Sequence, residues 1–309
     1  MLSVVAPIYN EEGTLEELHR RLAAVLAPLG PHEIVLVDDG SRDRSWEVME
    51  RIAAVDDQVH LVRLSRNFGH QAAITAGLDA AKGDAVVTMD GDLQDPPELI
   101  AELVAQWNEG YDVVYAERTT RAGEARWRLG AIAIFYKLLR RIAGHEIPEN
   151  VGDFRLLSRR VVEALAAMPE RARFLRGMTS WVGFRQTGVA YQRDARYAGE
   201  SKYSPAKLMR LALDGITSFS TVPMQIVTWL GLLSIAFCLV VLAWTIGTRF
   251  FTDAAPQGWT SLLAVVLLLG GVQMLSLGII GQYIARIFDE AKQRPLYFVA
   301  ESRPPRVRD

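Results

Sequence analysis

Two long stretches without a single charged side chain constrain this 309-residue chain more than any other feature. Residues 215–248 and 254–285 contain no Asp, Glu, Lys or Arg, and the two stretches follow each other closely. A helix that crosses a bilayer needs about 20 mainly apolar residues, and 221–248 and 261–285 each supply that length. Buried helices of a soluble protein are the alternative, but such helices rarely lack charge on every face. We therefore predict two transmembrane helices joined as a hairpin.

Basic residues beside these stretches predict the orientation, because cytoplasmic flanks carry an excess of Lys and Arg. Three basic residues lie just before the first stretch and six follow the second, whereas the connecting segment carries only Arg249, offset by Asp253. We expect residues 1–203 to form a cytoplasmic domain, 204–220 to form juxtamembrane amphipathic helices, and 286–309 to form a cytoplasmic tail. The tail is rich in Pro and Arg from Arg303, so we predict that its end is disordered.

Charge and cysteine content exclude some classes of protein. The formal net charge is -2, whereas nucleic-acid-binding proteins usually show a clear basic excess. We therefore expect no nucleic-acid partner. Cys238 is the one cysteine of the chain, so no intrachain disulfide can form.

Before the charge-free stretches, short β-rich runs alternate with longer runs of helical spacing. The predicted strands are 2–6, 33–37, 59–64, 84–89 and 112–115, and the predicted helices are 15–26, 71–81, 96–107 and 124–143. This alternation predicts an α/β domain whose mostly parallel sheet is covered by helices on both faces. Ligands of such sheets bind beyond the carboxyl ends of the strands.

Polar clusters follow four successive predicted strands. They are Pro7-Ile8-Tyr9-Asn10-Glu11, Asp38-Asp39-Gly40-Ser41, Arg66-Asn67-Phe68-Gly69-His70 and Met89 to Pro97. Two adjacent aspartates are costly to bury without partners, so Asp38 and Asp39 suit a base or ribose that donates hydrogen bonds. Turn and helix-cap chemistry is the alternative for each cluster taken alone. Four clusters at one edge of a sheet favour a binding site.

The fourth cluster contains Asp90-Gly91-Asp92, a spacing that suits a metal ion. Positions i and i+2 of an extended segment point the same way, so both carboxylates can bind one Mg²⁺ or Mn²⁺ that also binds phosphate oxygens. Without a cation the two charges would repel and raise one pKa. Gln94 repeats the two-residue step and adds a neutral oxygen. A solvated acidic loop that caps the helix at Pro96 is the alternative.

The motifs PIYNEE, DDGSRD, RNFGHQAA, DGDLQDPPE, GDFRLLSR and GESKY, in this order, resemble those of glycosyltransferase family two. They are most similar to the polyprenyl-phosphate branch of that family, which includes dolichol-phosphate mannose synthase and the bactoprenol glucosyl transferases. The resemblance extends over residues 2–290. It implies the GT-A fold, Rossmann-like, followed by the two C-terminal membrane helices.

The resemblance also implies roles for individual residues. The nucleotide-sugar site would contain Pro7, Tyr9, Glu11, Asp39 and Asp90. The metal would be held by Asp90, Asp92 and Gln94. The catalytic centre would contain Asp92, Asp153 and Arg118, with Arg118 near the diphosphate or the acceptor phosphate. Arg196, Ser201 and Lys202 would close over the phosphates, although basic residues beside a membrane span are expected there in any case.

The implied reaction is an inverting, metal-dependent transfer of a sugar from a nucleotide sugar to a polyprenyl phosphate at the inner membrane. We expect UDP-glucose or a related UDP-sugar as the donor and Mg²⁺ or Mn²⁺ as the cofactor. We also expect a homo-oligomer, and the resemblance suggests a tetramer. The alternatives are a GDP-mannose-dependent enzyme, a processive polysaccharide synthase and a non-catalytic membrane scaffold. A synthase would carry a Gln-x-x-Arg-Trp motif, which is absent, and a scaffold would lack a metal carboxylate.

Asp153 occupies the position usually given the role of base, and a helix cap or an Arg-paired carboxylate is the alternative. A phosphate monoester with a second pKa of about 6 is largely dianionic at neutral pH and is already a nucleophile. We therefore predict that Asp153 orients the acceptor or completes the metal and diphosphate site. His70 is expected to line the pocket rather than act as a base. Arg171, Arg173 and Arg176, with Trp181, are expected to rest on lipid headgroups.

Overall fold

A computed structural model of the chain describes residues 1–118, 151–171, 173–191, 222–251 and 259–305. The chain divides into two compact units, Met1–Leu208 with Arg294–Asp309, and Met209–Gln293. The predicted helix at 124–143 and the juxtamembrane segment 204–220 lie outside the described residues, as do Arg196, Ser201 and Lys202.

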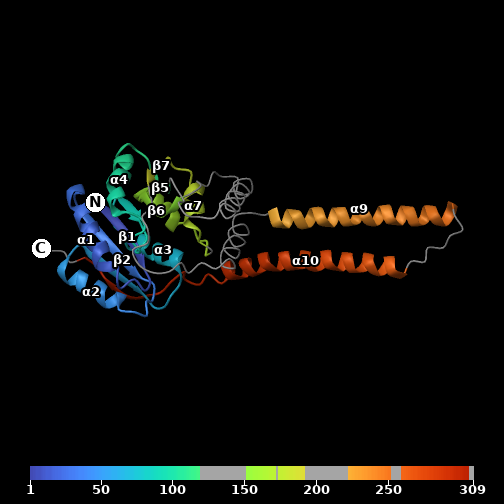
Figure 1. Ribbon diagram of the computed structural model, residues 1–309, viewed down its shortest axis with the longest axis horizontal. Helices are drawn as coiled ribbons and strands as arrows, with labels where there is room; N and C mark the ends of the chain where they lie inside the picture. The colour runs from blue at the N-terminus through green and yellow to red at the C-terminus, as the bar shows by residue number, and fades with distance from the viewer. Residues whose placement is uncertain (119–150, 172, 192–221, 252–258, 306–309) are drawn as a thin grey trace. The chain divides into compact units, whose positions relative to one another are not determined.

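An eight-stranded sheet forms the centre of the first unit (Figure 1). The strands are β1 (Leu2–Ile8), β2 (His32–Asp38), β3 (Val59–Leu64), β4 (Ala85–Thr88), β5 (Val113–Arg118), β6 (Val151–Ser158), β7 (Gln186–Tyr191) and β8 (Val299–Arg303). Their order in the sheet is β7-β5-β6-β4-β1-β2-β3-β8. β1 pairs in parallel with β2 and β4, β2 pairs in parallel with β3, and β5 with β7. The predicted α/β class with a mostly parallel sheet is therefore confirmed.

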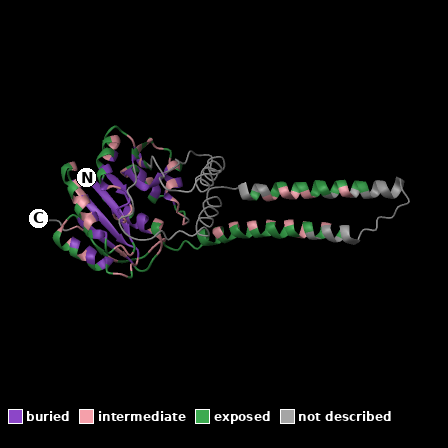
Figure 2. Ribbon diagram, in the orientation of Figure 1, coloured by how far each residue is buried: buried purple, intermediate pink, exposed green. Residues whose placement is uncertain are grey.

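Helices cover both faces of this sheet because successive strand residues point to opposite faces. One face packs against α1 (Leu15–Leu26), α2 (Ser45–Val55) and α4 (Ile100–Asn108). The other packs against α3 (His70–Ala80), α6 (Arg159–Ala166) and α7 (Leu175–Trp181). Short 3₁₀ helices lie at Ala27–Leu29 and Pro97–Leu99, so the predicted helix 96–107 is divided in two. Figure 2 shows the resulting buried layer along the strands.

Inside the sheet, β6 departs from the parallel pattern. It lies between β4 and β5 and runs antiparallel to both. Thr88, the last residue of β4, pairs with Arg155, so the first residues of β6 lie beside the carboxyl end of β4. This strand was not among the predicted elements. It places Asp153 inside a strand instead of at a helix cap.

The C-terminal tail also differs from its prediction. Residues Val299–Arg303 form β8, which pairs antiparallel with β3 and is the edge strand on that side of the sheet. Arg303 pairs with Leu61 and contacts Glu50 at 2.5 Å, so order extends past the point where we predicted disorder. The prediction was wrong at Arg303 because composition does not reveal that a free sheet edge accepts this segment.

The second unit contains α9 (Val222–Phe251) and α10 (Trp259–Ala291), two long helices that run antiparallel (Figure 1). Within the described residues, one helix segment, Leu268–Ala291, is long and apolar enough to cross a membrane. Large apolar side chains are exposed on both helices, including Trp229 at 67% and Met274 at 68% (Figure 2). Surfaces of this kind suit a lipid environment better than water.

Candidate active site

The polar clusters of the sequence meet at the carboxyl ends of β1, β2, β3 and β4. The ends of β1 and β2 are joined by side-chain hydrogen bonds. The amide of Asn10 donates to Ser41 Oγ at 3.1 Å, and the amide of Glu11 donates to Ser45 Oγ at 2.9 Å. Tyr9 lies between these residues and β1 with 38% of its surface exposed, so it is open to a ligand.

Asp39 fixes the loop that follows β3. Its Oδ1 accepts a hydrogen bond from the amide of Phe68 at 2.7 Å, and its Oδ2 accepts one from the amide of Gly69 at 3.0 Å. Gly40 packs directly below the same loop, because a Cβ there would lie 2.6 Å from the carbonyl carbon of Arg66. Burial raises the pKa of Asp39 although both amides lower it. Its charge is incompletely compensated, which suits a ligand that donates hydrogen bonds.

The Asp90–Asp95 loop packs against β1. A Cβ on Gly91 would lie 2.6 Å from Ile8 Cδ1, and the carbonyl of Gly91 accepts a hydrogen bond from Thr14 Oγ1 at 3.0 Å. Asp92, a predicted metal ligand, is oriented within the loop, because its Oδ1 accepts a hydrogen bond from the amide of Gln94 at 3.1 Å. Gln94 is buried, so its side chain is withdrawn from bulk water. Pro7 lies in the adjoining strand, and its carbonyl oxygen would be 3.2 Å from the same Gly91 Cβ.

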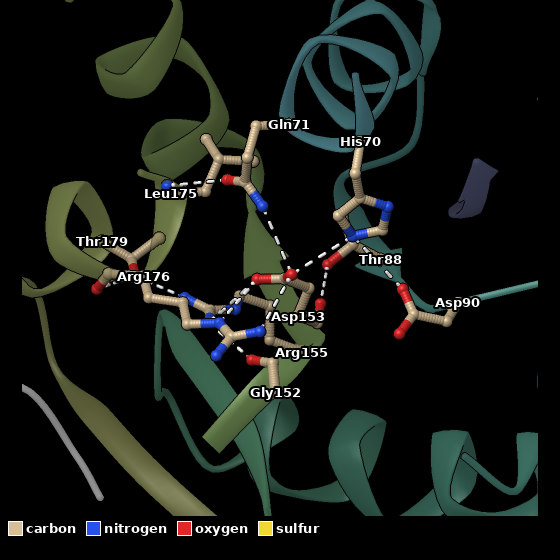
Figure 3. A network of polar contacts seen from close by, with 10 residues as sticks. All are labelled: His70, Gln71, Thr88, Asp90, Gly152, Asp153, Arg155, Leu175, Arg176 and Thr179. Carbon is tan, nitrogen blue, oxygen red and sulfur yellow. Dashed lines mark hydrogen bonds and ion pairs between the residues drawn. The ribbon is translucent and has the colours of Figure 1, made fainter. Parts of the chain in front are cut away.

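Asp153 lies at the centre of a polar network that joins four elements (Figure 3). Arg176 donates from Nε to Asp153 Oδ1 at 2.9 Å and from Nη2 to Oδ2 at 3.1 Å. His70 Nε2 lies 3.2 Å from Asp153 Oδ2 and 3.3 Å from Asp90 Oδ1. The carbonyl of Asp153 accepts a hydrogen bond from Thr88 Oγ1 at 2.5 Å. His70 therefore links the predicted catalytic aspartate to the predicted metal ligand.

Arg176 and Gln71 are site residues that the sequence did not identify as such. Gln71 donates from Nε2 to Asp153 Oδ2 at 3.3 Å, and its Oε1 accepts a hydrogen bond from the amide of Leu175 at 3.0 Å. It therefore connects α3 to α7. Arg176 is directed at Asp153, whereas we predicted that it rests on lipid headgroups. Of the two alternatives for Asp153, the Arg-paired carboxylate is the one observed. The sequence around Arg176 has no distinctive local pattern that would have marked it as a site residue.

The other two arginines of that expected lipid-facing group bond to backbone carbonyls. Arg173 donates from Nη2 to the carbonyl of Met168 at 2.7 Å, and Arg171 donates to the carbonyl of Pro295 at 3.3 Å. Trp181, at the end of α7, has 60% of its surface exposed. Trp181 is therefore the member of this group whose side chain remains available to contact lipid headgroups.

The charges of this network shift three pKa values in different directions. Burial opposes ionisation of Asp153, but Arg176, His70 and Arg155 hold its pKa well below the ordinary value. Burial likewise opposes charge on His70, yet its hydrogen bond to Asp153 and the charge of Asp90 raise its pKa. Burial, with repulsion from neighbouring aspartates, raises the pKa of Asp90 to about 6. Asp153 is thus a stable anion, whereas burial and the neighbouring aspartates disfavour the charged form of Asp90.

Arg155 is a buried member of the same network. It donates from Nη1 to Thr179 Oγ1 at 2.6 Å and from Nη2 to the carbonyl of Gly152 at 2.7 Å. Burial lowers the pKa of its guanidinium to about 10, although Asp153 acts in the opposite direction. The side chain remains charged at neutral pH and adds to the positive charge that Asp153 balances.

The aspartates of the Asp90–Asp95 loop suit a divalent cation that is shared with a ligand. Asp90 Oδ1 is buried without a hydrogen bond, 3.3 Å from His70 Nε2, and burial with the neighbouring aspartates raises the pKa of this carboxyl group to about 6. In the described part of the chain, no three His, Cys, Asp or Glu side chains converge as a complete metal site. Two carboxylates with phosphate oxygens from a substrate are therefore the donor set that fits, because Mg²⁺ commonly binds in this way.

The remaining predicted residues are only partly located. Arg118 is the last residue of β5, and its backbone pairs with Tyr191 of β7. Arg196, Ser201 and Lys202 lie outside the described residues. The structure thus brings together Asp39, Asp90, Asp153 and their loops, and leaves the predicted phosphate-closing group as an expectation.

Comparisons with known proteins show the family of this chain. Residues 3–166 match the family model "Glycosyl transferase family 2". An uncharacterized glycosyltransferase of Bacillus subtilis, YkcC, is 46% identical over 97% of this chain and 93% of its own length. The SfII prophage-derived bactoprenol glucosyl transferase of Shigella flexneri is 42% identical over 97% of this chain and 98% of its own length. This chain belongs to glycosyl transferase family 2 and is a glycosyltransferase.

The predicted resemblance to the polyprenyl-phosphate branch is confirmed by this full-length similarity. The crystal structure of glucosyl-3-phosphoglycerate synthase from Mycobacterium tuberculosis, in complex with phosphoglyceric acid, is similar with a TM-score of 0.50. It is 21% identical, with 71% of this chain and 80% of that chain covered. That likeness supports the GT-A fold alone.

Proposed function

We propose that this glycosyltransferase transfers a sugar from a nucleotide sugar, UDP-glucose or a related UDP-sugar, to the phosphate of a membrane polyprenyl phosphate. The observation that carries the proposal is the 42% identity to a bactoprenol glucosyl transferase over 97% of this chain. A match of this length extends over the residues of the sheet and over most of α9 and α10, which supports the proposal.

The donor pocket is proposed at the ends of β1 and β2, with Pro7, Tyr9, Glu11 and Asp39 facing the nucleoside. Asp39 is buried and already accepts two amide hydrogen bonds, yet burial raises its pKa. Donors on a base or ribose would stabilise the ionised carboxylate further. Tyr9, partly exposed beside it, offers an aromatic face to the same ligand.

Asp90, Asp92 and Gln94 are proposed to hold Mg²⁺ or Mn²⁺ together with the donor diphosphate. When bound, such an ion stabilises negative charge on a leaving nucleoside diphosphate. The buried Asp90 Oδ1, which has no hydrogen bond, supports this assignment. Arg118 and the segment with Arg196, Ser201 and Lys202 are proposed to bind the diphosphate and the acceptor phosphate.

Asp153 is proposed to organise this site and not to act as an obligatory base. Arg176 donates to both of its oxygens, and His70 and Gln71 approach Oδ2. A carboxylate with this many donors is a weak proton acceptor. The acceptor phosphate is largely dianionic near neutral pH, so it can attack without losing a proton. A single displacement of the nucleoside diphosphate by this phosphate would invert the sugar carbon.

The apolar helices support a membrane location for this chemistry. The acceptor keeps its polyprenyl tail in the bilayer, so the enzyme must work at the membrane surface. We propose that 221–248 and 261–285 both span the inner membrane, with the catalytic domain and both termini in the cytoplasm. Large exposed apolar side chains along α9 and α10 support this arrangement. A homo-oligomer, a tetramer by analogy with relatives, is proposed for the assembly.

The function is tested with membranes that contain the full-length protein, labelled UDP-glucose and polyprenyl phosphate. We expect label in the organic phase, lost with EDTA and restored by Mg²⁺ or Mn²⁺. Asp90→Asn should remove most of this activity, whereas Glu109→Gln serves as the control because this exposed carboxylate lies in a turn after α4.

The same assay separates the alternatives. Label that enters the lipid only from GDP-mannose would indicate the mannosyltransferase instead. Label found only in an aqueous polymer would indicate a polysaccharide synthase. Failure with every donor, in membranes where the folded protein is present, would contradict the proposed function.

A further inference from the structure

The segment after the second long helix packs along the edge of the catalytic sheet. We name residues 294–305 the C-terminal strap. Its strand β8 pairs antiparallel with β3, with Leu64 opposite Val299. The pairing continues past the end of β3, because the amide of Ser65 donates to the carbonyl of Phe298 at 2.9 Å. The strap therefore contacts the first residue of the loop that leads to His70.

Three separate contacts anchor the strap to different elements. Tyr297 donates its hydroxyl to Asp79 Oδ2 of α3 at 2.7 Å. Ser302 Oγ lies 3.1 Å from His60 Nε2 of β3. Arg303 forms an ion pair with Glu50 of α2 at 2.5 Å, and its guanidinium lies 5.8 Å from the ring centroid of Trp46. These anchors lie on both sides of the point where Phe298 meets the loop.

Phe298 contacts the 65–70 loop through its ring as well as its carbonyl. The Phe298 and Phe68 rings are 6.3 Å apart and inclined by 52°, within the range of favourable aromatic pairs. The guanidinium of Arg66 lies 3.9 Å from the centroid of the same Phe68 ring. Residues Ser65, Arg66 and Asn67 are exposed, so the sheet core gives these positions little support.

The same loop carries groups that face the proposed substrate site. The amides of Phe68 and Gly69 are the two donors to Asp39. The next residue, His70, begins α3 and contacts both Asp90 and Asp153. A displacement of Phe68 would therefore disturb the nucleoside carboxylate first and the Asp153 network second.

We propose that the C-terminal strap positions the nucleoside-binding loop, with Phe298 as the positioning residue that holds Phe68. This rests on the proposed function for the identity of the ligand at Asp39. Phe298 has no proposed contact with the ligand. It acts by keeping the amides of Phe68 and Gly69 on Asp39, so that the carboxylate meets the nucleotide in one orientation.

The test compares full-length wild-type protein with Phe298→Ala and Phe298→Tyr in detergent. Hydrogen exchange of the peptide that contains residues 66–70 reports on the loop without any ligand. Titration with UDP in the presence of Mg²⁺, and donor kinetics with UDP-glucose, report on the pocket. Val299→Ala is the matched control, since Val299 is similarly exposed and pairs with Leu64 of β3.

Phe298→Ala should speed exchange in the loop and weaken UDP binding by about three- to tenfold, the usual size of one aromatic pair. The donor KM should rise by a similar factor while kcat changes little. Phe298→Tyr should restore both properties, and Val299→Ala should leave them near wild type.

Unchanged loop exchange and unchanged UDP binding in Phe298→Ala would overturn the inference. Equal losses in Val299→Ala would also overturn it, because they would indicate general unpairing of β8. A wild-type protein that binds neither UDP nor GDP would contradict the proposed function instead. The exchange comparison would then still decide whether Phe298 holds the loop.

Discussion

Asp153 has polar contacts with Arg176, His70 and Gln71, and those contacts restrict its role. We predict that Asp153→Asn lowers kcat by less than about 100-fold, the lower end of what a positioned general base contributes. The pH dependence of kcat should keep its shape, because the acceptor phosphate supplies its own nucleophile. Steady-state kinetics between pH 6 and 9 measure both. Complete loss of turnover, with donor and metal binding intact, would indicate an obligatory base.

The Asp153–Arg176 pair has a separate effect on stability. Asp153 is 7% exposed, and removal of Arg176 leaves its carboxylate with fewer donors. We predict that Arg176→Gln lowers the free energy of unfolding of the first unit by about 1–3 kcal/mol. Because Asp153→Asn removes the buried charge, the double variant should lose less than the sum of the single losses. Strict additivity in thermal unfolding would show that the two side chains act independently.

At the scale of secondary-structure elements, Gly40 determines how closely the β2 and β3 ends approach. Its φ is +68°, and a Cβ would lie 2.6 Å from backbone atoms of Arg66 and Asn67, which cannot rotate away. We predict that Gly40→Ala moves the 65–70 loop from Asp39, costs about 1–3 kcal/mol of stability and weakens nucleotide binding. Gly13→Ala is the control, because nothing lies within 4 Å of a Cβ there. Normal UDP binding by Gly40→Ala would exclude this packing role.

The junction of β5, β6 and α6 makes stability depend on pH. Asp112 is buried and accepts hydrogen bonds from Arg160 and from Ser158 Oγ. Burial would raise the pKa of Asp112, but these partners hold it below the ordinary 3.8. The unfolded state therefore binds a proton more readily, so this stabilisation is complete above about pH 5 and is lost as the pH falls through the folded pKa.

Replacement of this carboxylate should remove that dependence. We predict that Asp112→Asn costs about 1–3 kcal/mol at pH 7 and less at pH 3, measured by urea unfolding. Glu163→Gln, an exposed carboxylate on α6, is the control. An equal cost at both pH values would show that Asp112 acts through packing rather than charge.

Local sequence patterns predicted the parts of the site that follow directly from a strand and the loop after it. Asp39 and Asp90 follow strands with clear apolar runs, so their position at the sheet edge could be predicted from strand order and parallel connections. Asp153 and Arg176 could not be placed in this way. Asp153 reaches the same edge because β6 enters the sheet antiparallel beside β4, and Arg176 reaches Asp153 from α7. β8 pairs with residues more than 230 positions earlier, which no local pattern indicates.

At the scale of the whole molecule, two physical requirements are met by separate parts of one chain. The first unit gathers charge and hydrogen-bond donors at one sheet edge, whereas α9 and α10 expose apolar side chains along their length. A polar site and an apolar anchor are both needed for an enzyme whose acceptor has a charged head and a hydrocarbon tail. The charge-free stretches therefore belong to the same functional proposal as Asp90 and Asp153.

The orientation of the helices can be tested because Cys238 is the single cysteine. In a Cys238→Ser background, we predict that Gln257→Cys reacts with a membrane-impermeant maleimide in intact spheroplasts. Glu109→Cys should react only after permeabilisation, because the basic flanks predict that the first unit is cytoplasmic. Both variants should react equally in detergent, which controls for intrinsic reactivity. Labelling of Glu109→Cys alone in intact spheroplasts would indicate the reverse orientation. Labelling of neither variant or of both would contradict the two-span hairpin that the charge pattern predicts.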